Sequence, residues 1–150
     1  MRQMMMLGLA LVALGCADME PWTPEGEYRG TFQVGDEGSS TTTEAAAIVT
    51  GDHLIELEIL GVCPLPMAEQ SRSETSAAYM LSEFTICPMR RQDGFEYRLD
   101  VRRAGARIDR EGMSVDIWGV ACPGVGTGCP GDSESFYMRF DGLYYGEVPH

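Results

Sequence analysis

Five cysteines are the residues of this 150-residue chain whose chemistry is most readily interpreted. Four of them are each followed directly by proline, and these are Cys63, Cys87, Cys122 and Cys129. Proline cannot donate a hydrogen bond to a β-ladder, so we expect all four cysteines in loops or near the ends of strands. In an exported chain, an even number of cysteines favours disulfides.

Two pairings satisfy this expectation best. A disulfide between Cys122 and Cys129 would close a short loop and stabilise the fold by about 2.5 kcal/mol. A disulfide between Cys63 and Cys87 would close a longer loop and stabilise the fold by about 3.5 kcal/mol. In a plain meander, however, Cys63 and Cys87 would lie at opposite edges of the sheet. Either residues 64–76 run back across the fold, or Cys87 pairs with the 122/129 loop. A zinc site of four thiolates is the other interpretation, but close Cys-x₂₋₄-Cys spacing is missing.

The fifth cysteine, Cys16, ends an apolar run that follows a single positive charge. Arg2 precedes the run Met4–Leu14, which contains no polar side chain, and Gly15 follows it. A charged start, a short apolar stretch and a small residue are typical of an export signal. The run is too short to cross a bilayer, which takes ~20 residues.

The segment Val12-Ala13-Leu14-Gly15-Cys16 resembles the lipobox of bacterial lipoproteins. This resemblance implies that residues 1–15 are a signal peptide, cleaved before Cys16, whose thiol and new amine then carry acyl chains. Two or more chains hold a protein firmly on a membrane, whereas one holds it marginally. By analogy with enteric sorting, Ala17 favours the outer membrane of the cell envelope, with the protein facing the periplasm or the exterior. The alternatives are an ordinary secretory signal cut nearby and an uncleaved N-terminal anchor.

The charge of the chain is strongly negative, at −12, and every basic residue is arginine. Nucleic acid binding needs a basic surface, so nucleic acid is not an expected partner. Seven arginines nevertheless cluster in one segment, and these are Arg90, Arg91, Arg98, Arg102, Arg103, Arg107 and Arg110. They either project into solvent from one hairpin and pair with neighbours such as Glu56 and Glu58, or form a patch facing anionic headgroups or an acidic partner. The planar guanidinium group suits the second role, because it binds phosphate and carboxylate at two points.

No arrangement of residues predicts a catalytic site, a metal site or a cofactor. The segment Gly124–Gly128 looks like a phosphate loop, but no Lys or Ser completes the pattern and no helix is expected after it. We expect a flexible, disulfide-closed loop instead. His53 follows Asp52 in an expected turn and is expected at the surface, and His150 offers no further partner for a catalytic group. We therefore expect that the protein is not an enzyme.

The remaining sequence predicts β-strands, because apolar and polar residues alternate with period two. Residues 17–26 read as a tether in which Trp22 lies either at the membrane interface or over one end of the fold. Residues 64–76 read as a long loop or a short helix opened by Pro66, and Ala104-Gly105 reads as a turn. The expected strands are Glu27–Val34, Ala45–Val49, Leu54–Leu60, Ala77–Ile86, Phe95–Arg103, Met113–Val120 and Ser135–Tyr145.

Seven or eight short strands with Gly-rich turns predict an all-β, antiparallel barrel or sandwich. We expect one domain, residues 27–150, after a lipidated tether at 16–26. The Gly-x-Tyr-x-Gly-x-Phe pattern of residues 26–32 resembles the first strand of lipocalin-like periplasmic barrels. The expected function is a non-enzymatic module that binds another envelope protein or stabilises an envelope assembly. The alternative is a small barrel that holds an apolar ligand among inward residues such as Met80, Met113 and Met138.

Overall fold

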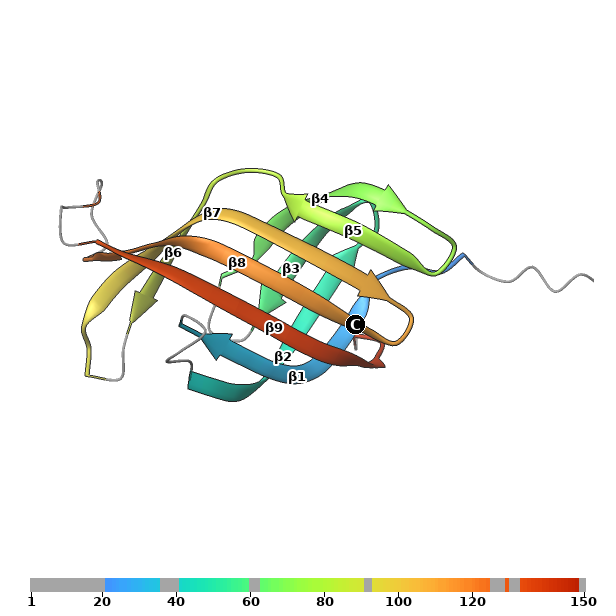
Figure 1. Ribbon diagram of the computed structural model, residues 1–150, viewed down its shortest axis with the longest axis horizontal. Helices are drawn as coiled ribbons and strands as arrows, with labels where there is room; N and C mark the ends of the chain where they lie inside the picture. Colours follow the sequence, from blue (N-terminus) through green and yellow to red (C-terminus); the bar gives the residue numbers. More distant parts are fainter. Residues whose placement is uncertain are drawn as a thin grey trace, which may run out of the picture.

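The computed structural model describes residues 21–35, 41–59, 63–90, 93–124, 129 and 133–148. These residues form nine strands that pair in antiparallel fashion in one sheet, which confirms the all-β antiparallel prediction. Figure 1 shows their arrangement. The strands are β1 (Gly26–Val34), β2 (Thr41–Gly51), β3 (Leu54–Ile59), β4 (Leu65–Arg72), β5 (Ser76–Leu81), β6 (Thr85–Arg90), β7 (Glu96–Asp109), β8 (Gly112–Pro123) and β9 (Glu134–Gly146).

The sheet closes on itself along the long strand β7. Neighbours run from β5 through β4, β3, β2 and β1 to β9, β8 and β7. The second half of β7 then pairs with β5, from Ser76 opposite Asp109 to Met80 opposite Gly105, and this pairing completes the ring. The first half of β7 pairs with β6. Strands β5 and β6 therefore lie end to end along one edge of β7, and the sheet is a closed, barrel-like one.

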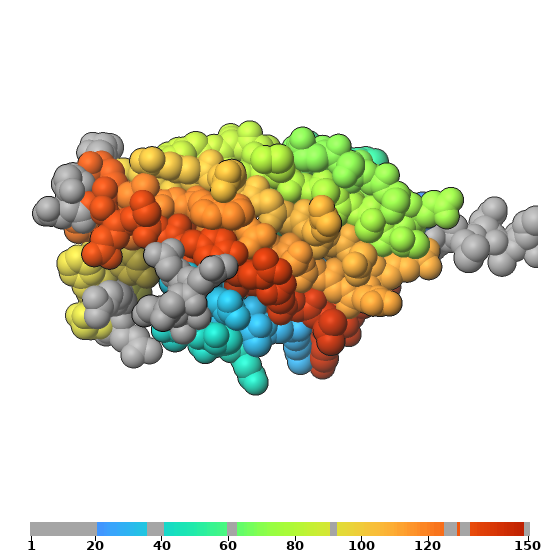
Figure 2. Space-filling model, in the orientation of Figure 1, coloured from blue at the N-terminus to red at the C-terminus, as the bar shows by residue number. Residues whose placement is uncertain are grey.

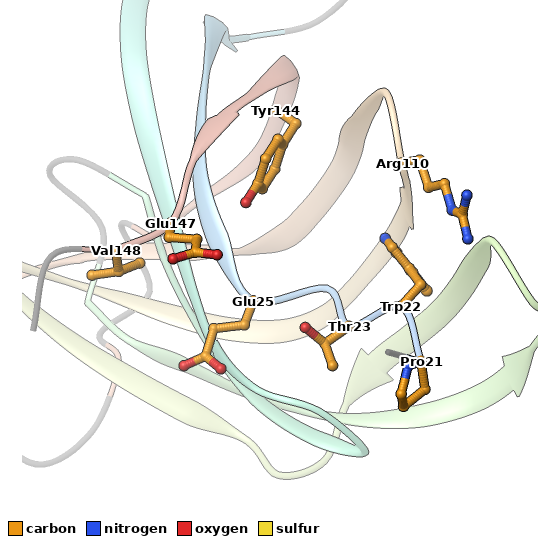
Figure 3. Close-up of a pocket in the computed structure, with 8 residues that line it drawn as sticks. All are labelled: Pro21, Trp22, Thr23, Glu25, Arg110, Tyr144, Glu147 and Val148. Carbon is orange, nitrogen blue, oxygen red and sulfur yellow. The ribbon is translucent and has the colours of Figure 1, made fainter. Parts of the chain in front are cut away.

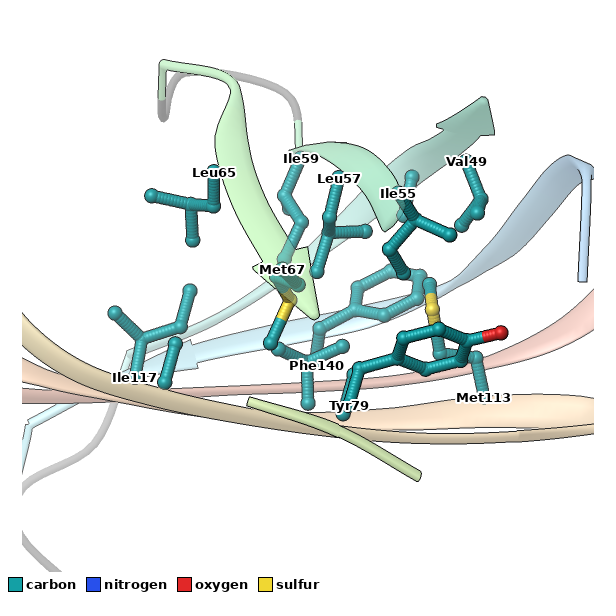
Figure 4. Close-up of a cluster of buried hydrophobic side chains, with 14 of the residues drawn as sticks. Val49, Ile55, Leu57, Ile59, Leu65, Met67, Tyr79, Met113, Ile117 and Phe140 are labelled. Carbon is teal, nitrogen blue, oxygen red and sulfur yellow. The ribbon is translucent and has the colours of Figure 1, made fainter. Parts of the chain in front are cut away.

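Side chains from every part of the ring fill its interior (Figure 4). The alternation of β3 directs Ile55, Leu57 and Ile59 inward and leaves the glutamates between them exposed. The largest fully buried side chains include Tyr28 of β1, Tyr79 of β5 and Phe140 of β9. Burying apolar surface contributes roughly 25 cal/mol per Å², so this shared interior is the main source of stability.

Residues 64–76 form neither a loop nor a helix, because most of them belong to β4. Leu65 and Met67 alternate into the core, and both are almost fully buried. Pro66 lies between them, opposite Glu56 of β3, and its carbonyl accepts a hydrogen bond of 2.9 Å from the amide of Ser82. The alternation was present in the sequence, but the proline obscured it.

The expected turn at Ala104-Gly105 is also wrong, since both residues lie within β7. Ala104 and Ala106 are buried in the core, and Gly105 lies on the outer face between them. A β-bulge between Val101 and Arg103 shifts the register, so both halves of the strand bury one face. The small residues thus continue a strand instead of ending one.

Both expected disulfides are present in the structure, Cys63–Cys87 and Cys122–Cys129. Strand β4 leads away from Cys63, and β5 and β6 then return the chain, so Cys87 comes back beside Cys63 with a Cα–Cα distance of 5.4 Å. Residues 64–76 do run back across the fold, which was the first of the two alternatives. Among the described strands, β6 pairs with β7 alone. The Cys63–Cys87 bond therefore closes the seam that hydrogen bonding leaves open on the other side of β6.

Two glycines that face each other allow β1 and β9 to approach closely. Gly30 lies opposite Gly142 in the ladder. A Cβ atom on Gly30 would collide with the backbone carbonyl oxygen of Asp141, and one on Gly142 would collide with the Phe140 ring. A collision with backbone cannot be relieved by a side-chain rotation, so Gly30 is required for this crossing.

We expect Gly30→Ala to destabilise the protein by about 1–3 kcal/mol, the range for overpacked sites. The matched control is Gly105→Ala, because a Cβ atom there meets nothing nearer than the Tyr79 carbonyl oxygen at 3.9 Å. Chemical denaturation with a circular-dichroism readout compares the two variants. Equal stability of both variants would contradict the close approach.

Candidate functional site

One end of the barrel carries most of the polar structure, and we call it the tether end. The chain enters the sheet there at Gly26 and leaves β9 there at Gly146, since β1 and β9 are antiparallel neighbours. The β2–β3, β4–β5 and β7–β8 turns lie at the same end. Figure 1 and Figure 2 show this end on the right.

The segment Pro21–Glu25 packs over the tether end. Trp22 is half-buried against the hydrophobic core, and Pro24 is buried. The Tyr28 hydroxyl donates a hydrogen bond of 2.7 Å to the Pro24 carbonyl oxygen, and burial raises the pKa of that hydroxyl. Of the two positions considered for Trp22, the structure shows the one over the end of the fold. Residues 21–25 are therefore part of the folded domain rather than a free tether.

Arg72, the last residue of β4, connects this segment to the barrel. Its Nη1 donates to the Trp22 carbonyl oxygen at 3.3 Å, and its guanidinium carbon lies 5.7 Å from the centre of the Trp22 ring. Its Nε donates to Glu69 Oε2 at 2.7 Å, and its Nη2 donates to Asp52 Oδ1 at 2.5 Å. The Tyr79 hydroxyl donates to the Asp52 carbonyl oxygen at 2.8 Å. We call Trp22, Asp52, Glu69, Arg72 and Tyr79 the Arg72 network.

The charges of the Arg72 network stabilise one another. Hydrogen bonding from Arg72 lowers the pKa of Glu69, and His53 adds to this effect. Burial opposes the charge on Arg72, but the hydrogen bonds to Glu69 and Asp52 outweigh it and raise the Arg72 pKa. Burial raises the pKa of Tyr79 to about 12, so its hydroxyl stays protonated and able to donate.

His53 joins the Arg72 network from its solvent side. Its Nδ1 lies 3.0 Å from Glu69 Oε2 and its Nε2 lies 3.6 Å from Asp52 Oδ2, while 74% of its side chain is exposed. The prediction of a surface histidine beside a turn is confirmed. No nucleophile contacts this ring among the residues that the structure describes.

Beside Trp22 the tether end contains a cleft of about 630 Å³, which we call the tether-end cleft (Figure 3). Tyr144 of β9 forms one wall, and its ring packs edge-on against Tyr28 with centroids 5.5 Å apart. No local sequence pattern predicts this cleft, because its walls come from three distant parts of the chain. The lining residues are Pro21, Trp22, Thr23, Glu25, Arg110, Tyr144, Glu147 and Val148.

The arginine segment does not form the single outward patch that was one interpretation of the sequence. Arg98 is only 7% exposed and Asp100 only 5%. Arg98 Nε lies 2.8 Å from Asp100 Oδ1, and its Nη2 donates to Asp100 Oδ2 at 3.1 Å. Arg98 lies opposite Cys122 on the outer face of the sheet, next to the Cys122–Cys129 disulfide. Arg98 is thus unavailable to a partner, and Arg91 lies outside the described residues.

The other arginines of the segment are exposed and spread along β7 from the β6–β7 hairpin to the β7–β8 turn. Arg90 pairs with Glu96 across the hairpin, and not with Glu56 or Glu58 of β3. The Arg103 guanidinium lies 4.1 Å from the centre of the Trp118 ring on β8. These arginines are exposed, and because an isolated exposed ion pair contributes only about 0–1 kcal/mol, a partner could displace the contact between Arg90 and Glu96.

Among the described residues, one group of potential metal ligands comes together, formed by Asp100, Cys122 and Cys129. The two sulfur atoms are bonded to each other, and the Asp100 carboxylate is paired with Arg98. Their donor atoms are therefore already engaged. Cys16, His150 and residues 125–128 of the glycine-rich loop lie outside the described residues.

Comparison with known proteins yields no match to a protein family, to a curated protein or to a solved structure. Within its described ranges the chain forms no apolar helix of membrane-spanning length.

The Arg72 network predicts a specific dependence of stability on pH. The folded-state pKa of Glu69 is lowered, so its stabilising effect is complete above the ordinary glutamate pKa of about 4.3 and is lost as the pH falls through the folded-state value. Glu69→Gln should lower the thermal midpoint at pH ~7, and the difference from wild type should shrink as the pH falls below the ordinary glutamate pKa and through the lowered folded-state pKa. The control is Glu83→Gln, which changes an exposed glutamate outside the network. A difference that persists in acid would show that packing, and not charge, is responsible.

Proposed function

We propose that the chain is a lipoprotein of the bacterial cell envelope, anchored through Cys16, and that its barrel is a non-enzymatic binding or structural module. The observation that carries this proposal is the attachment of Trp22 to the barrel by Arg72. Trp22 follows Cys16 by 22 − 16 = 6 residues, a span of at most about 20 Å. An acyl anchor at Cys16 would therefore hold the tether end close to the membrane and present the rest of the barrel away from it.

The filled interior supports binding at the surface over binding inside the barrel. Met113 and Met138 belong to the packed core, where they contact other buried side chains. Met80, which the apolar-ligand alternative placed inward, lies on the outer face and is 46% exposed. Small eight-stranded barrels are commonly filled by their own side chains, and the described interior follows this pattern.

The surface best suited to a protein partner lies along β6. Ile86 of β6 and Phe84, which directly precedes the strand, are both about half exposed. Thr85, between them, pairs with Val101 of β7, so Arg102 follows directly beside this apolar pair. Arg103 comes next, with its guanidinium over the Trp118 ring of β8. Aromatic residues and arginine are enriched at protein interfaces, and the arginines favour an acidic partner. We propose that another envelope protein binds here.

The anchor is tested by Cys16→Ser. We expect the variant to lose its association with the membrane fraction, because no acyl chain can then be attached, while Ala17→Ser keeps it. Fractionation and intact-mass analysis of the mature protein are the measurements. Unmodified wild-type protein cut at another position would refute the anchor.

The partner surface is tested with a photo-crosslinking residue at Phe84 or Ile86 in living cells. We expect the same envelope protein to be captured from both positions, and capture to be lost when Arg102→Glu and Arg103→Glu are added. A crosslinker at Leu143, which is 71% exposed on β9, is the control. Equal capture from Leu143 would eliminate β6 as the binding surface, and a co-purifying lipid in place of a protein would favour the apolar-ligand alternative.

A further inference from the structure

The tether-end cleft is lined by charges that have no partner within the described part of the chain. Glu25, Arg110 and Glu147 form no hydrogen bond or ion pair with any residue that the structure describes. Elsewhere in the same protein Arg29, Arg72 and Arg139 are all paired with carboxylates. A cleft with unpaired charges of both signs is able to pair with charges on a ligand.

These charges are separated across the cleft. In Figure 3 the carboxylates of Glu25 and Glu147 lie at one side and Arg110 lies at the other. Trp22 and Tyr144 stand between them. The cleft therefore has a negative side and a positive side joined by aromatic walls, which suits a ligand that carries one positive and one negative group.

The negative side has the chemistry of an ammonium site. An ammonium group is attracted to carboxylates by its charge and to the face of an aromatic ring by the quadrupole of that ring. Glu25, Glu147 and the ring of Tyr144 provide these two elements. The positive side offers Arg110, whose planar guanidinium binds phosphate through two hydrogen bonds.

We infer that the tether-end cleft binds a phosphate-linked amine, with the amine between Glu25 and Glu147 and the phosphate on Arg110. The source that fits best is the headgroup of a zwitterionic phospholipid, and this choice of source rests on the proposed anchoring of the chain at a membrane. The cleft contains Trp22, which lies within about 20 Å of the proposed acyl anchor. The same cleft would then bind the membrane surface to which Cys16 attaches the protein.

The test uses the full-length chain in a maltoside detergent, whose headgroup carries no charge. The probe is phosphoethanolamine, and the signal is the fluorescence of Trp22 in a Trp118→Phe background, since the chain has only two tryptophans. We expect saturable binding with a dissociation constant on the order of 1 mM. Ethanolamine alone and inorganic phosphate alone should each bind more weakly, because each reaches one side of the cleft.

Single charge removals identify the cleft as the site. Glu147→Gln and Arg110→Gln should each weaken binding about fivefold, the effect of losing one partly exposed charge pair. Glu83→Gln and Arg107→Gln remove charges outside the cleft and should leave the affinity unchanged. Unchanged affinity in both cleft variants, or no saturable signal in the parent protein, would overturn the inference.

Mixed micelles separate the two sources of the amine. Phosphatidylethanolamine in the micelles should compete with soluble phosphoethanolamine, whereas phosphatidylglycerol should not. Competition by neither lipid would overturn the headgroup as the source and leave a soluble phosphate-linked amine. Because these measurements require no acylation, failure of the cleft and failure of the Cys16 anchor are distinguishable.

Discussion

Closure of the sheet along β7 is the constraint from which the rest of the structure follows. By pairing with β8 on one edge and with β5 and β6 on the other, β7 fixes the circumference of the ring. A ring of that size encloses a limited volume, and Tyr28, Tyr79 and Phe140 occupy much of it. The tether end and the seam beside β6 are closed by different means. The Arg72 network and Trp22 close the tether end, and the Cys63–Cys87 bond closes the seam beside β6.

The sequence was most informative where burial is one-sided. Period-two alternation located β3 and the first half of β7, because each strand has one face in the core and one in solvent. It failed at β4, where Pro66 suggested a loop although Leu65 and Met67 kept the alternation. It failed again at Gly105, because a glycine on the outer face of a strand has the same local appearance as a glycine in a turn. Local patterns thus locate strands better than they locate the ends of strands.

The functional surfaces were less accessible to sequence reasoning, for a different reason. The tether-end cleft combines Trp22, Arg110 and Glu147, which no local spacing connects. Arg98 had the polarity of an outward residue and does lie on the outer face, yet its burial beside the disulfide depends on a tertiary contact. The ion pair between Arg98 and Asp100, however, could have been predicted from their spacing in the sequence. Arg98 and Asp100 are two residues apart, so they share a face of the strand and can form an ion pair.

The Cys63–Cys87 bond has a consequence for when and where this protein can mature. All eight junctions of the ring, and the pairing of β6 with β7, need only backbone hydrogen bonds. The other side of β6 is held by a covalent bond that requires an oxidant. Cytosolic thiols are kept reduced, and exported proteins are oxidised after translocation. In a reducing compartment, β6 would be held among the described strands by its ladder with β7 alone. If the chain is exported as proposed, oxidation fixes the outer edge of β6 only after the chain has left the compartment of its synthesis, on a barrel that backbone pairing has already closed.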